Sequence, residues 1–550
     1  MARIPPTSLL PTHEVTNQPD DFAGTNLYTA DAALREAALR EGGEWLDESL
    51  RELGEQAGSA EMLELGMLAN RHPPELLSFD RYGRRIDEVR FHPAYHELMT
   101  RAMDCGIHDV AWTVNRPGGH VAHAARLALF TQAEAGTMCP MSMTYAAVPA
   151  LRAGGADARW LEKLLGGRYD PDLAPIATKR GITIGMAMTE KQGGSDVRAN
   201  TTRAYRQDNG SYRLIGHKWF CSAPMSDGFL TLAYTEDGLS CFLAPRVTPD
   251  GERNSIQIMR LKDKLGNRSN ASSEIEYHDA YGALLGEEGG GIKVIIDMVH
   301  HTRLGTIAGT LGIMRMALAQ AFHHTSGRRV FQRTLIDQPL MRSVLADLAV
   351  EYEAAAALVM RVGRAFDGTD ESERAFSRLA VAVAKYWLTK RCPGFVYECM
   401  ECLGGAGYVE ESMMPRLFRE SPLNAIWEGS GNVIALDILR TLARKSGAAL
   451  EVYAAELALA GGGDERLDAA AAELLSILDR AAPAEAEARH VAEKLALLLQ
   501  AALLVRHAPQ AVSDLFIGSR IAGQAGHSYG AFAGEVPIKP VIDRQMSAVA

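Results

Sequence analysis

A glutamate beside a tryptophan is the side chain in this sequence best suited to act as a base. Glu428 lies in the run Asn424-Ala-Ile-Trp-Glu-Gly-Ser-Gly-Asn432, where Ile426 and Trp427 give it an apolar setting. A carboxylate in a low-dielectric setting has its charged form disfavoured, which raises its pKa toward the range useful for proton abstraction. The same residues are also typical of a helix N-terminus, with Ser430 as the cap and Glu428 near the positive end of the dipole. Local sequence leaves both interpretations open.

A second run combines glycines with hydroxyl side chains. Met188-Thr-Glu-Lys-Gln-Gly-Gly-Ser-Asp-Val197 follows the apolar segment from Ile182 to Met188, which predicts a strand that ends in a loop. The adjacent glycines allow a tight path with exposed backbone N–H groups, and Thr189 and Ser195 add hydroxyls. The P-loop ending and the G-x-G-x-x-G spacing are both absent, so the loop suits a polar, anionic, partly flat ligand better than a bare phosphate. A polar surface turn is the alternative.

Two further groupings are better explained by packing. Cys399-Met-Glu-Cys402 has C-x-x-C spacing, but it lacks the other two ligands of a structural zinc site and lies within a predicted helix. The adjacent pairs His300-His301 and His323-His324 point in different directions on a helix and cannot chelate jointly. We therefore expect no metal site.

The candidate residues lie on different kinds of predicted secondary structure. After a proline-bearing arm, helical periodicity begins at Asp31 and continues to about Leu165. Residues 181–290 contain short β-prone segments separated by Asp-Gly and Asn-Gly turns, which is typical of an antiparallel β domain. Long helical segments follow, and the expected bundle helices span 292–326, 338–367 and 373–403. The expected domains are 1–180, 181–290, 291–445 and an extra helical domain at 446–550.

Composition narrows the class of protein. The 550 residues are 47% hydrophobic, and 57 basic residues against 68 acidic ones give a net charge of −11. This balance argues against nonspecific binding to nucleic acid or an anionic membrane as the main activity. Seven scattered cysteines and a polar N-terminus without a signal-peptide core predict a reducing, cytoplasmic setting. No apolar run reaches membrane-spanning length.

Six ordered motifs resemble the acyl-CoA dehydrogenase family. The loop from Thr189 resembles its flavin-binding T-E-x-x-x-G-S-D segment, and Gly216 to Ser222 resembles its G-x-K-x-W-I-T strand. The other four motifs are Leu284 to Ile292, Arg328 to Phe331, Leu403 to Tyr408 and Ile426 to Ser430. The similarity is narrower to the AidB-type flavoproteins of the response to alkylation, through runs such as Arg260 to Ala271 and through the extra C-terminal domain.

The resemblance implies an α+β fold of the acyl-CoA dehydrogenase type, with FAD between the β domain and the C-terminal helices. Thr189 and Ser195 would hydrogen-bond the isoalloxazine and the pyrophosphate side, Phe220 would pack on the ring, and Ser222 would reach flavin N5. The other cofactor-binding residues that it implies are Met188, Gly404, Gly405, Ile426, Trp427, Gly429, Ser430 and Asn432. Arg328 and Phe331 would contact the FAD of a neighbouring subunit in a homotetramer.

The reaction implied by this resemblance is α,β-dehydrogenation of an acyl-CoA. Glu428 would remove the α-proton while the β-hydrogen leaves as hydride to flavin N5. The position that carries the base in some family members, before Arg303, is Thr302 here. An electron-transfer flavoprotein is the expected electron acceptor. The acyl chain length does not follow from the sequence.

A second class of function follows from the same resemblance. AidB-type proteins are linked to DNA binding through a basic C-terminal domain, with weak dehydrogenase activity. Residues 446–550 hold 8 Lys and Arg against 13 Asp and Glu, whereas a duplex-binding surface should be basic. In the same region, Arg520 resembles an arginine that projects toward the active site of that subgroup, and a salt bridge is the alternative.

Overall fold

The N-terminal region of the computed structural model, which describes residues 4, 6–443, 448–480 and 483–547, is mainly helical. Its helices begin where local caps allow: Asp31 accepts a hydrogen bond from Leu34 N at 3.1 Å, and Ser59 accepts one from Met62 N at 3.2 Å. The helices are Ala32–Gly42 (α1), Asp47–Ala57 (α2), Ala60–Arg71 (α3), Pro93–Asp104 (α4), Val110–Thr113 (α5), Gly119–Ala133 (α6), Met138–Ala153 (α7) and Ala158–Leu164 (α8).

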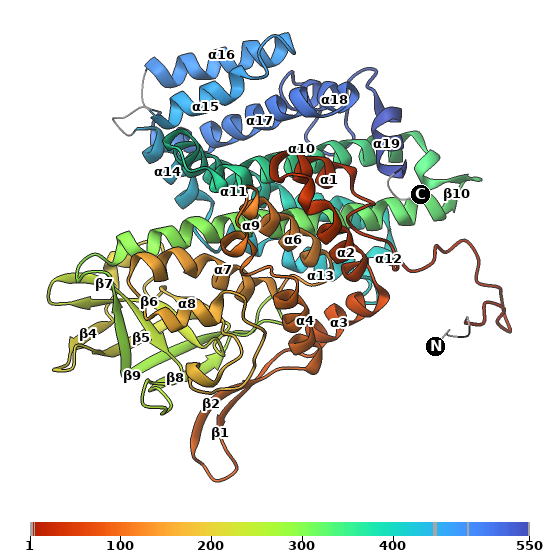
Figure 1. The fold of residues 1–550 in the computed structure, drawn as a ribbon. Helices are drawn as coiled ribbons and strands as arrows, with labels where there is room; N and C mark the ends of the chain where they lie inside the picture. Colours follow the sequence, from red (N-terminus) through yellow and green to blue (C-terminus); the bar gives the residue numbers. More distant parts are fainter. Residues whose placement is uncertain (1–3, 5, 444–447, 481–482, 548–550) are drawn as a thin grey trace.

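A β-hairpin interrupts these helices, where helical sequence was expected. Its strands are Glu75–Phe79 (β1) and Arg85–Arg90 (β2), and Figure 1 shows the hairpin projecting beside the β domain. Distant residues hold it: Asp87 Oδ1 accepts a hydrogen bond from Ile258 N, and Asp87 O accepts one from Arg246, each at 2.8 Å. Because these bonds join segments far apart in the sequence, local periodicity does not reveal the hairpin.

The β domain is one seven-stranded sheet in the order β3-β6-β4-β5-β9-β7, with β8 paired to β9. An additional β6–β7 pairing closes five of these strands into a ring. The antiparallel expectation is wrong for two pairs, because β6 pairs parallel with both β3 and β4. The strands are Ile184–Ala187 (β3), Arg203–Arg206 (β4), Tyr212–Ser222 (β5), Gly228–Thr235 (β6), Gly238–Pro245 (β7), Ile256–Leu261 (β8) and Ser272–Leu285 (β9).

Long helices form the centre of the molecule and carry the second half of the candidate site. Helix α9 runs across the molecule from the β domain, and α6, α7, α10 and α11 pack against it (Figure 1). The elements are Gly291–Gly327 (α9), Arg329–Val330 (β10), Arg333–Thr334 (β11), Pro339–Asp367 (α10), Glu371–Cys402 (α11), Gly405–Tyr408 (α12), Met414–Glu420 (α13) and Gly431–Leu442 (α14). The three long helices agree with the predicted spans to within two residues at each end.

The C-terminal region is helical and packs on the central bundle. Helix α17 contacts α10, α11 and α14, and α19 contacts α10. The helices are Ala448–Ala458 (α15), Glu465–Arg480 (α16), Ala488–His507 (α17), Gln510–Arg520 (α18) and Ile538–Ser547 (α19). The predicted domain boundary between 445 and 446 lies outside the described residues. Within the described part of the chain, no helix is both long and apolar enough to cross a membrane.

Candidate functional site

The loop after β3 folds back onto β5. Asn200 Nδ2 donates to Met188 O at 3.0 Å, and Trp219 N donates to Thr189 O at 2.7 Å. Glu190 and Gly193 pair as an isolated bridge within the loop. The run from Met188 to Val197 is therefore fixed along the strand that carries Phe220 and Ser222. The glycine-containing loop and the Gly216 to Ser222 strand thus form one surface.

A buried carboxylate anchors this loop from beneath. Glu190 accepts hydrogen bonds from the N–H and hydroxyl groups of Thr201 and Thr202, and Lys218 Nζ lies 3.0 Å from its Oε1. Burial alone would raise the pKa of Glu190, but the Lys218 charge and these hydrogen bonds together lower it to about 2. Glu190 is thus an ionised structural residue, and its carboxylate takes no part in lining the loop's outer face.

The outer face of this surface carries hydroxyls and an exposed aromatic ring. The Phe220 side chain is 48% exposed, and Ser195 lies exposed on the loop. Ser222 Oγ lies 3.3 Å from Ser272 Oγ, a long contact that leaves its hydroxyl available to a ligand. A Cβ on Gly194 would lie 2.3 Å from Thr189 Oγ1, so only glycine permits this close approach.

Glu428 occupies a tight turn between a short 3₁₀ helix, Leu423–Ala425, and α14. Glu428 has φ 54° and Gly429 has φ 100°, so two successive residues are left-handed. Such backbone is rare for a residue with a side chain and costs free energy, which the surrounding contacts must offset. In the described part of the chain, the Ser430 side chain makes no capping hydrogen bond to α14. The alternative of an ordinary capped helix start therefore does not describe this turn.

The Glu428 carboxylate is held by α9 and its turn by α11. Thr302 Oγ1 donates to Glu428 Oε2 at 2.7 Å, and Lys385 Nζ donates to Gly429 O at 2.6 Å. Burial raises the pKa of Glu428, although the Thr302 hydrogen bond and the Lys385 and Arg303 charges oppose that rise. Burial likewise lowers the pKa of Lys385 to about 7. The carboxylate is therefore shifted toward a working pKa for a general base.

An arginine pair supports the same region of α9. Arg303 donates to Asp437 Oδ2 at 2.7 Å, and Arg378 donates to both Asp437 oxygens at 2.6 and 3.0 Å. Burial would raise the pKa of Asp437, but these two guanidinium groups lower it to about 2. From the sequence, Thr302 is only the position at which some family members carry the base. Lys385 is not predicted; the one feature that could indicate it is a lysine within an apolar helical stretch.

A small cavity lies next to the Glu428 turn and is lined in part by Cys139. Burial raises the pKa of the Cys139 thiol to about 12, and both the Glu428 carboxylate and the Ser222 hydroxyl act on that thiol, so Cys139 lies between the two halves of the site. The cavity has a volume of about 40 Å³. It is lined by Leu127, Thr131, Ala135, Met138, Cys139, Ser142, Asn267, Gly305, Thr306, Gly309, Ile313, Glu420, Leu423, Asn424 and Trp427.

Several sequence candidates lie apart from this centre in the single chain. Arg328 donates to Asn17 O at 2.8 Å, and Phe331 is 93% exposed at the tip of the β10–β11 hairpin, at the opposite end of the molecule from the β domain (Figure 1). Gly404 and Gly405 are exposed where α12 begins. Within the single chain, these residues are therefore not part of the surface formed by the loop after β3 and β5.

Two C-terminal residues take structural partners. Asn432 Oδ1 accepts from Arg489 at 2.8 Å, which ties α14 to α17. Arg520 donates to Asp347 and to Glu351 Oε2, the latter at 2.9 Å. Arg520 therefore forms a salt bridge, which is the alternative that the sequence left open. Its carboxylate partners are buried rather than on the surface.

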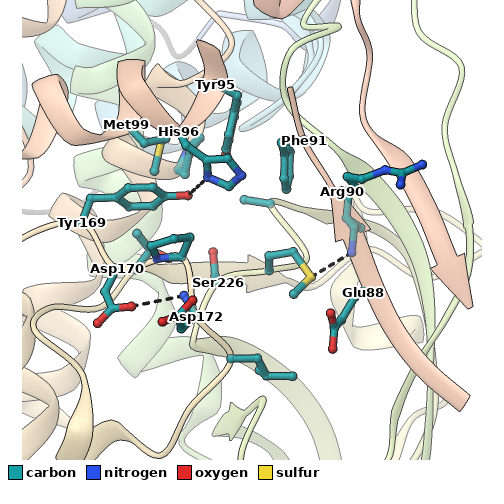
Figure 2. A pocket seen from close by; sticks show the side chains of 17 residues that line it. Glu88, Arg90, Phe91, Tyr95, His96, Met99, Tyr169, Asp170, Asp172 and Ser226 are labelled. Carbon is teal, nitrogen blue, oxygen red and sulfur yellow. Dashed lines mark hydrogen bonds between the residues drawn. The ribbon is translucent and has the colours of Figure 1, made fainter. Parts of the chain in front are cut away.

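A larger cavity, of about 360 Å³, lies between the N-terminal hairpin, α4 and the β domain. Figure 2 shows Tyr169 and His96 on one side of it and Phe91 on the other, with His96 Nδ1 2.9 Å from Tyr169 Oη. Within the described part of the chain, the residues that line it include no member of the sequence-derived site. It is a separate space from the cavity beside Glu428.

Comparison with known proteins gives the class to which this fold and site belong. Residues 17–171 match the adaptive response protein AidB N-terminal domain, residues 185–280 the acyl-CoA dehydrogenase middle domain, and residues 289–443 the acyl-CoA dehydrogenase C-terminal domain. The chain belongs to the acyl-CoA dehydrogenase family. Within it, the chain is of the AidB type: it is 49% identical to "Putative acyl-CoA dehydrogenase AidB" of Escherichia coli (strain K12), over 90% of this chain and 92% of that protein.

More distant relatives share the whole architecture. Acyl-CoA dehydrogenase family member 11 of Caenorhabditis elegans is 31% identical over 82% of this chain and 78% of that protein. The crystal structure of C. elegans ACDH-11 in complex with C11-CoA superposes with a TM-score of 0.85 at 26% identity and covers 97% of both chains. The expected α+β fold, with helical regions on both sides of a β domain, is confirmed.

Proposed function

We propose that this protein is an FAD-dependent acyl-CoA dehydrogenase in which Glu428 is the catalytic base. The observation that carries the proposal is the Glu428 turn, where a left-handed backbone, a hydrogen bond from Thr302 and a raised pKa occur together beside a cavity. A purely structural carboxylate has no need of a strained turn. Such strain is typical of functional sites.

The residues of the β domain fit a flavin. Thr189, Ser195 and Ser222 would supply hydroxyls for the polar edge of the cofactor, and the exposed ring of Phe220 would be covered by its ring system. The absent Cβ at Gly194 lets the loop pack against the Thr189 side chain that would face the cofactor. Met188, Ile426, Trp427, Gly429, Ser430 and Asn432 are proposed to complete the wall. When bound, FAD would supply the acceptor for the hydride that leaves the β-carbon.

The chain's own part in the reaction is proton transfer and orientation. Glu428 would take the α-proton of the acyl thioester, and Thr302 would hold Oε2 so that the other oxygen, Oε1, faces the substrate. Lys385, through the carbonyl of Gly429, would keep the turn in place while the carboxylate changes charge. A raised pKa makes Glu428 a stronger base than an ordinary carboxylate, and position matters as much as basicity.

The assembly and partners follow from the same proposal. Arg328, Phe331, Gly404 and Gly405 would contact the FAD of a neighbouring subunit in a homotetramer. The substrate would be an acyl-CoA, as for the C. elegans relative, whose crystal structure is in complex with C11-CoA. An electron-transfer flavoprotein would reoxidise the cofactor. We do not adopt DNA binding as the function, because residues 446–550 carry 8 basic against 13 acidic residues.

Anaerobic titration of the purified yellow protein with a panel of acyl-CoAs tests the proposal. We expect loss of the oxidised flavin absorbance with at least one member of the panel. A protein that binds no flavin under any loading condition would contradict the cofactor assignment. Duplex binding that weakens with salt, together with flavin that no acyl-CoA reduces, would instead favour a DNA-protecting role.

A further inference from the structure

We propose that the acyl pocket takes a short acyl group that carries a neutral hydrogen-bonding substituent, such as a hydroxyl or a primary amide. The inference rests on the proposed function, because it identifies the cavity beside Glu428 as the acyl pocket. Trp427 lines this cavity and directly precedes Glu428, and Thr306 lies one turn of α9 beyond Thr302. The cavity therefore adjoins the residue that precedes the proposed base.

The size of the cavity limits the acyl group. One water needs about 10–15 Å³ of such volume, so the 40 Å³ here corresponds to about three water-sized groups. Leu127, Ile313 and Leu423 form apolar walls that are fully or partly buried against the core. The acyl chain beyond the reacting carbons is thus restricted to a few heavy atoms, and an eleven-carbon chain like that of the C. elegans complex exceeds the space.

Two buried polar atoms at this cavity have no hydrogen-bond partner among the described residues. They are Trp427 Nε1, a donor, and Asn267 Oδ1, an acceptor. Asn267 is only 2% exposed, so bulk water does not satisfy its side chain. Buried polar groups in folded proteins are almost always paired, so an unpaired donor and an unpaired acceptor on residues that line one cavity point to a polar ligand.

Several other polar groups of the wall are already engaged. Thr131 Oγ1 donates to Leu127 O at 2.7 Å, and Asn424 Nδ2 donates to Thr310 Oγ1 at 2.9 Å. Glu420 Oε1 accepts from Asn267 N at 2.7 Å. A hydrocarbon chain would leave the indole N–H and the Asn267 amide oxygen unpaired, whereas a hydroxyl accepts from the first and donates to the second.

The charges around the cavity favour a neutral substituent. An anionic group would bring an unpaired charge into a buried wall, beside the Glu420 carboxyl. Burial and the Glu134 charge raise the pKa of Glu420 to about 7, against the charges of Arg416 and Lys264, so this carboxyl offers a cation no fixed negative charge. Lys264 itself is committed to Asn270 O at 2.5 Å and Ser272 Oγ at 2.9 Å. An uncharged donor–acceptor group meets none of these penalties.

Matched thioesters test the proposal on the flavin-loaded protein. Binding of butyryl-CoA, 4-hydroxybutyryl-CoA, 4-aminobutyryl-CoA, succinyl-CoA and hexanoyl-CoA would be measured by calorimetry with the Glu428→Gln variant, which holds the ligand without turnover. We expect 4-hydroxybutyryl-CoA to bind at least tenfold tighter than butyryl-CoA, and hexanoyl-CoA to bind more weakly than butyryl-CoA. Equal binding of the first two, or tightest binding of hexanoyl-CoA or of either charged ester, would overturn the proposal.

A second variant separates pocket chemistry from folding. Trp427→Phe keeps the ring but removes the indole N–H, so in the Glu428→Gln background the binding ratio of 4-hydroxybutyryl-CoA to butyryl-CoA should fall toward one. Trp219→Phe makes the same change on β5, away from the cavity, and should leave this ratio unchanged. If the ratio falls in both variants, or in neither, the Trp427 indole N–H is not the donor to the acyl substituent. If no thioester reduces the wild-type flavin, the proposed function fails. The binding ratio of 4-hydroxybutyryl-CoA to butyryl-CoA then shows by itself whether the cavity prefers a polar acyl group.

Discussion

At the scale of residues, the state of Glu428 is set by opposing influences. Burial favours its protonated form, whereas the Thr302 hydroxyl and the Lys385 ammonium favour the carboxylate. A base needs this compromise: it must be ionised when substrate binds and yet hold a proton well once it has taken one. Thr302 and Lys385 are therefore positioning residues that act through Glu428 and its turn.

Removal of the Thr302 hydroxyl should shift the pH dependence of flavin reduction. Thr302→Val deletes a hydrogen bond to the ionised form, so the pKa of Glu428 rises and the activity that depends on the carboxylate begins at higher pH. A hydrogen bond to a charged group corresponds to a shift of about one pH unit or slightly more. The measurement is the reduction rate between pH 5 and 9.

The matched control is Thr325→Val on the same helix. Among the described residues, Thr325 Oγ1 bonds only within α9, to Ala321 O and Phe322 O. The profile of this variant should coincide with wild type. A Thr302→Val profile that keeps its midpoint while its amplitude falls would mean that Thr302 affects structure alone.

At the scale of elements, a few local signals account for what the sequence predicted. The spans of α9, α10 and α11 follow from 3.6-residue periodicity over long stretches, and the Glu428 and Met188–Val197 motifs were recognised as runs of residue types. The β1–β2 hairpin and the Lys385 contact were missed, because their partners lie far away in sequence. Parallel pairing of β3 with β6 is likewise a long-range feature that alternation cannot reveal.

The loop after β3 depends on one buried ion pair. Glu190→Gln leaves Lys218 buried without a charge partner, which should cost about 3–5 kcal/mol of unfolding free energy. Because the pKa of Glu190 is lowered to about 2 in the folded chain, its contribution is present above about pH 4.5 and is lost as the pH falls toward 2. Urea unfolding at pH 7 measures this loss of unfolding free energy.

The exposed Glu236→Gln in a turn of the same domain serves as the control and should change stability by less than about 0.5 kcal/mol. If Glu190→Gln unfolds at the same urea concentration as wild type, Glu190 does not anchor the loop.

At the scale of the whole molecule, a cluster of buried imidazoles links N-terminal helices to α9. His120 and His301 lie 5.5 Å apart between ring centroids, and His123 stacks on Tyr145 at 3.5 Å. Burial lowers the pKa of His123 to about 3 and that of His301 to about 4. These rings are therefore neutral packing groups, and acid should loosen the contact between the two helical regions.

Stability should fall as the pH decreases below about 6.5, the usual pKa of histidine in an unfolded chain. There the unfolded chain binds protons that the folded chain excludes, so each such histidine costs about 1.4 kcal/mol per pH unit. Asp367, whose pKa is raised to about 6, opposes part of this because the folded chain takes up its proton first. His123→Phe should reduce the stability difference between pH 7 and 5, whereas the exposed His13→Phe should not; equal stability of wild type at both pH values would contradict the account.

The exposed hairpin tip belongs to the same scale, because its proposed role is to contact the FAD of a neighbouring subunit. Phe331→Ser should lower both the FAD content and the fraction of tetramer. The substitution removes a 93% exposed ring that would pack against the neighbouring subunit. Tyr82→Ser, at the exposed turn of the β1–β2 hairpin, is the control and should leave both unchanged. Light scattering with absorbance at the flavin band measures the two quantities; a Phe331→Ser tetramer with full FAD would refute this role.

Proton abstraction by Glu428 is tested by the anaerobic rate of flavin reduction in Glu428→Gln. The amide keeps the shape of the side chain and cannot accept the proton. If Glu428 is the base, the reduction rate should be about 10²–10⁴-fold below wild type, with the flavin still bound. Reduction within a few-fold of the wild-type rate would show that another group is the base.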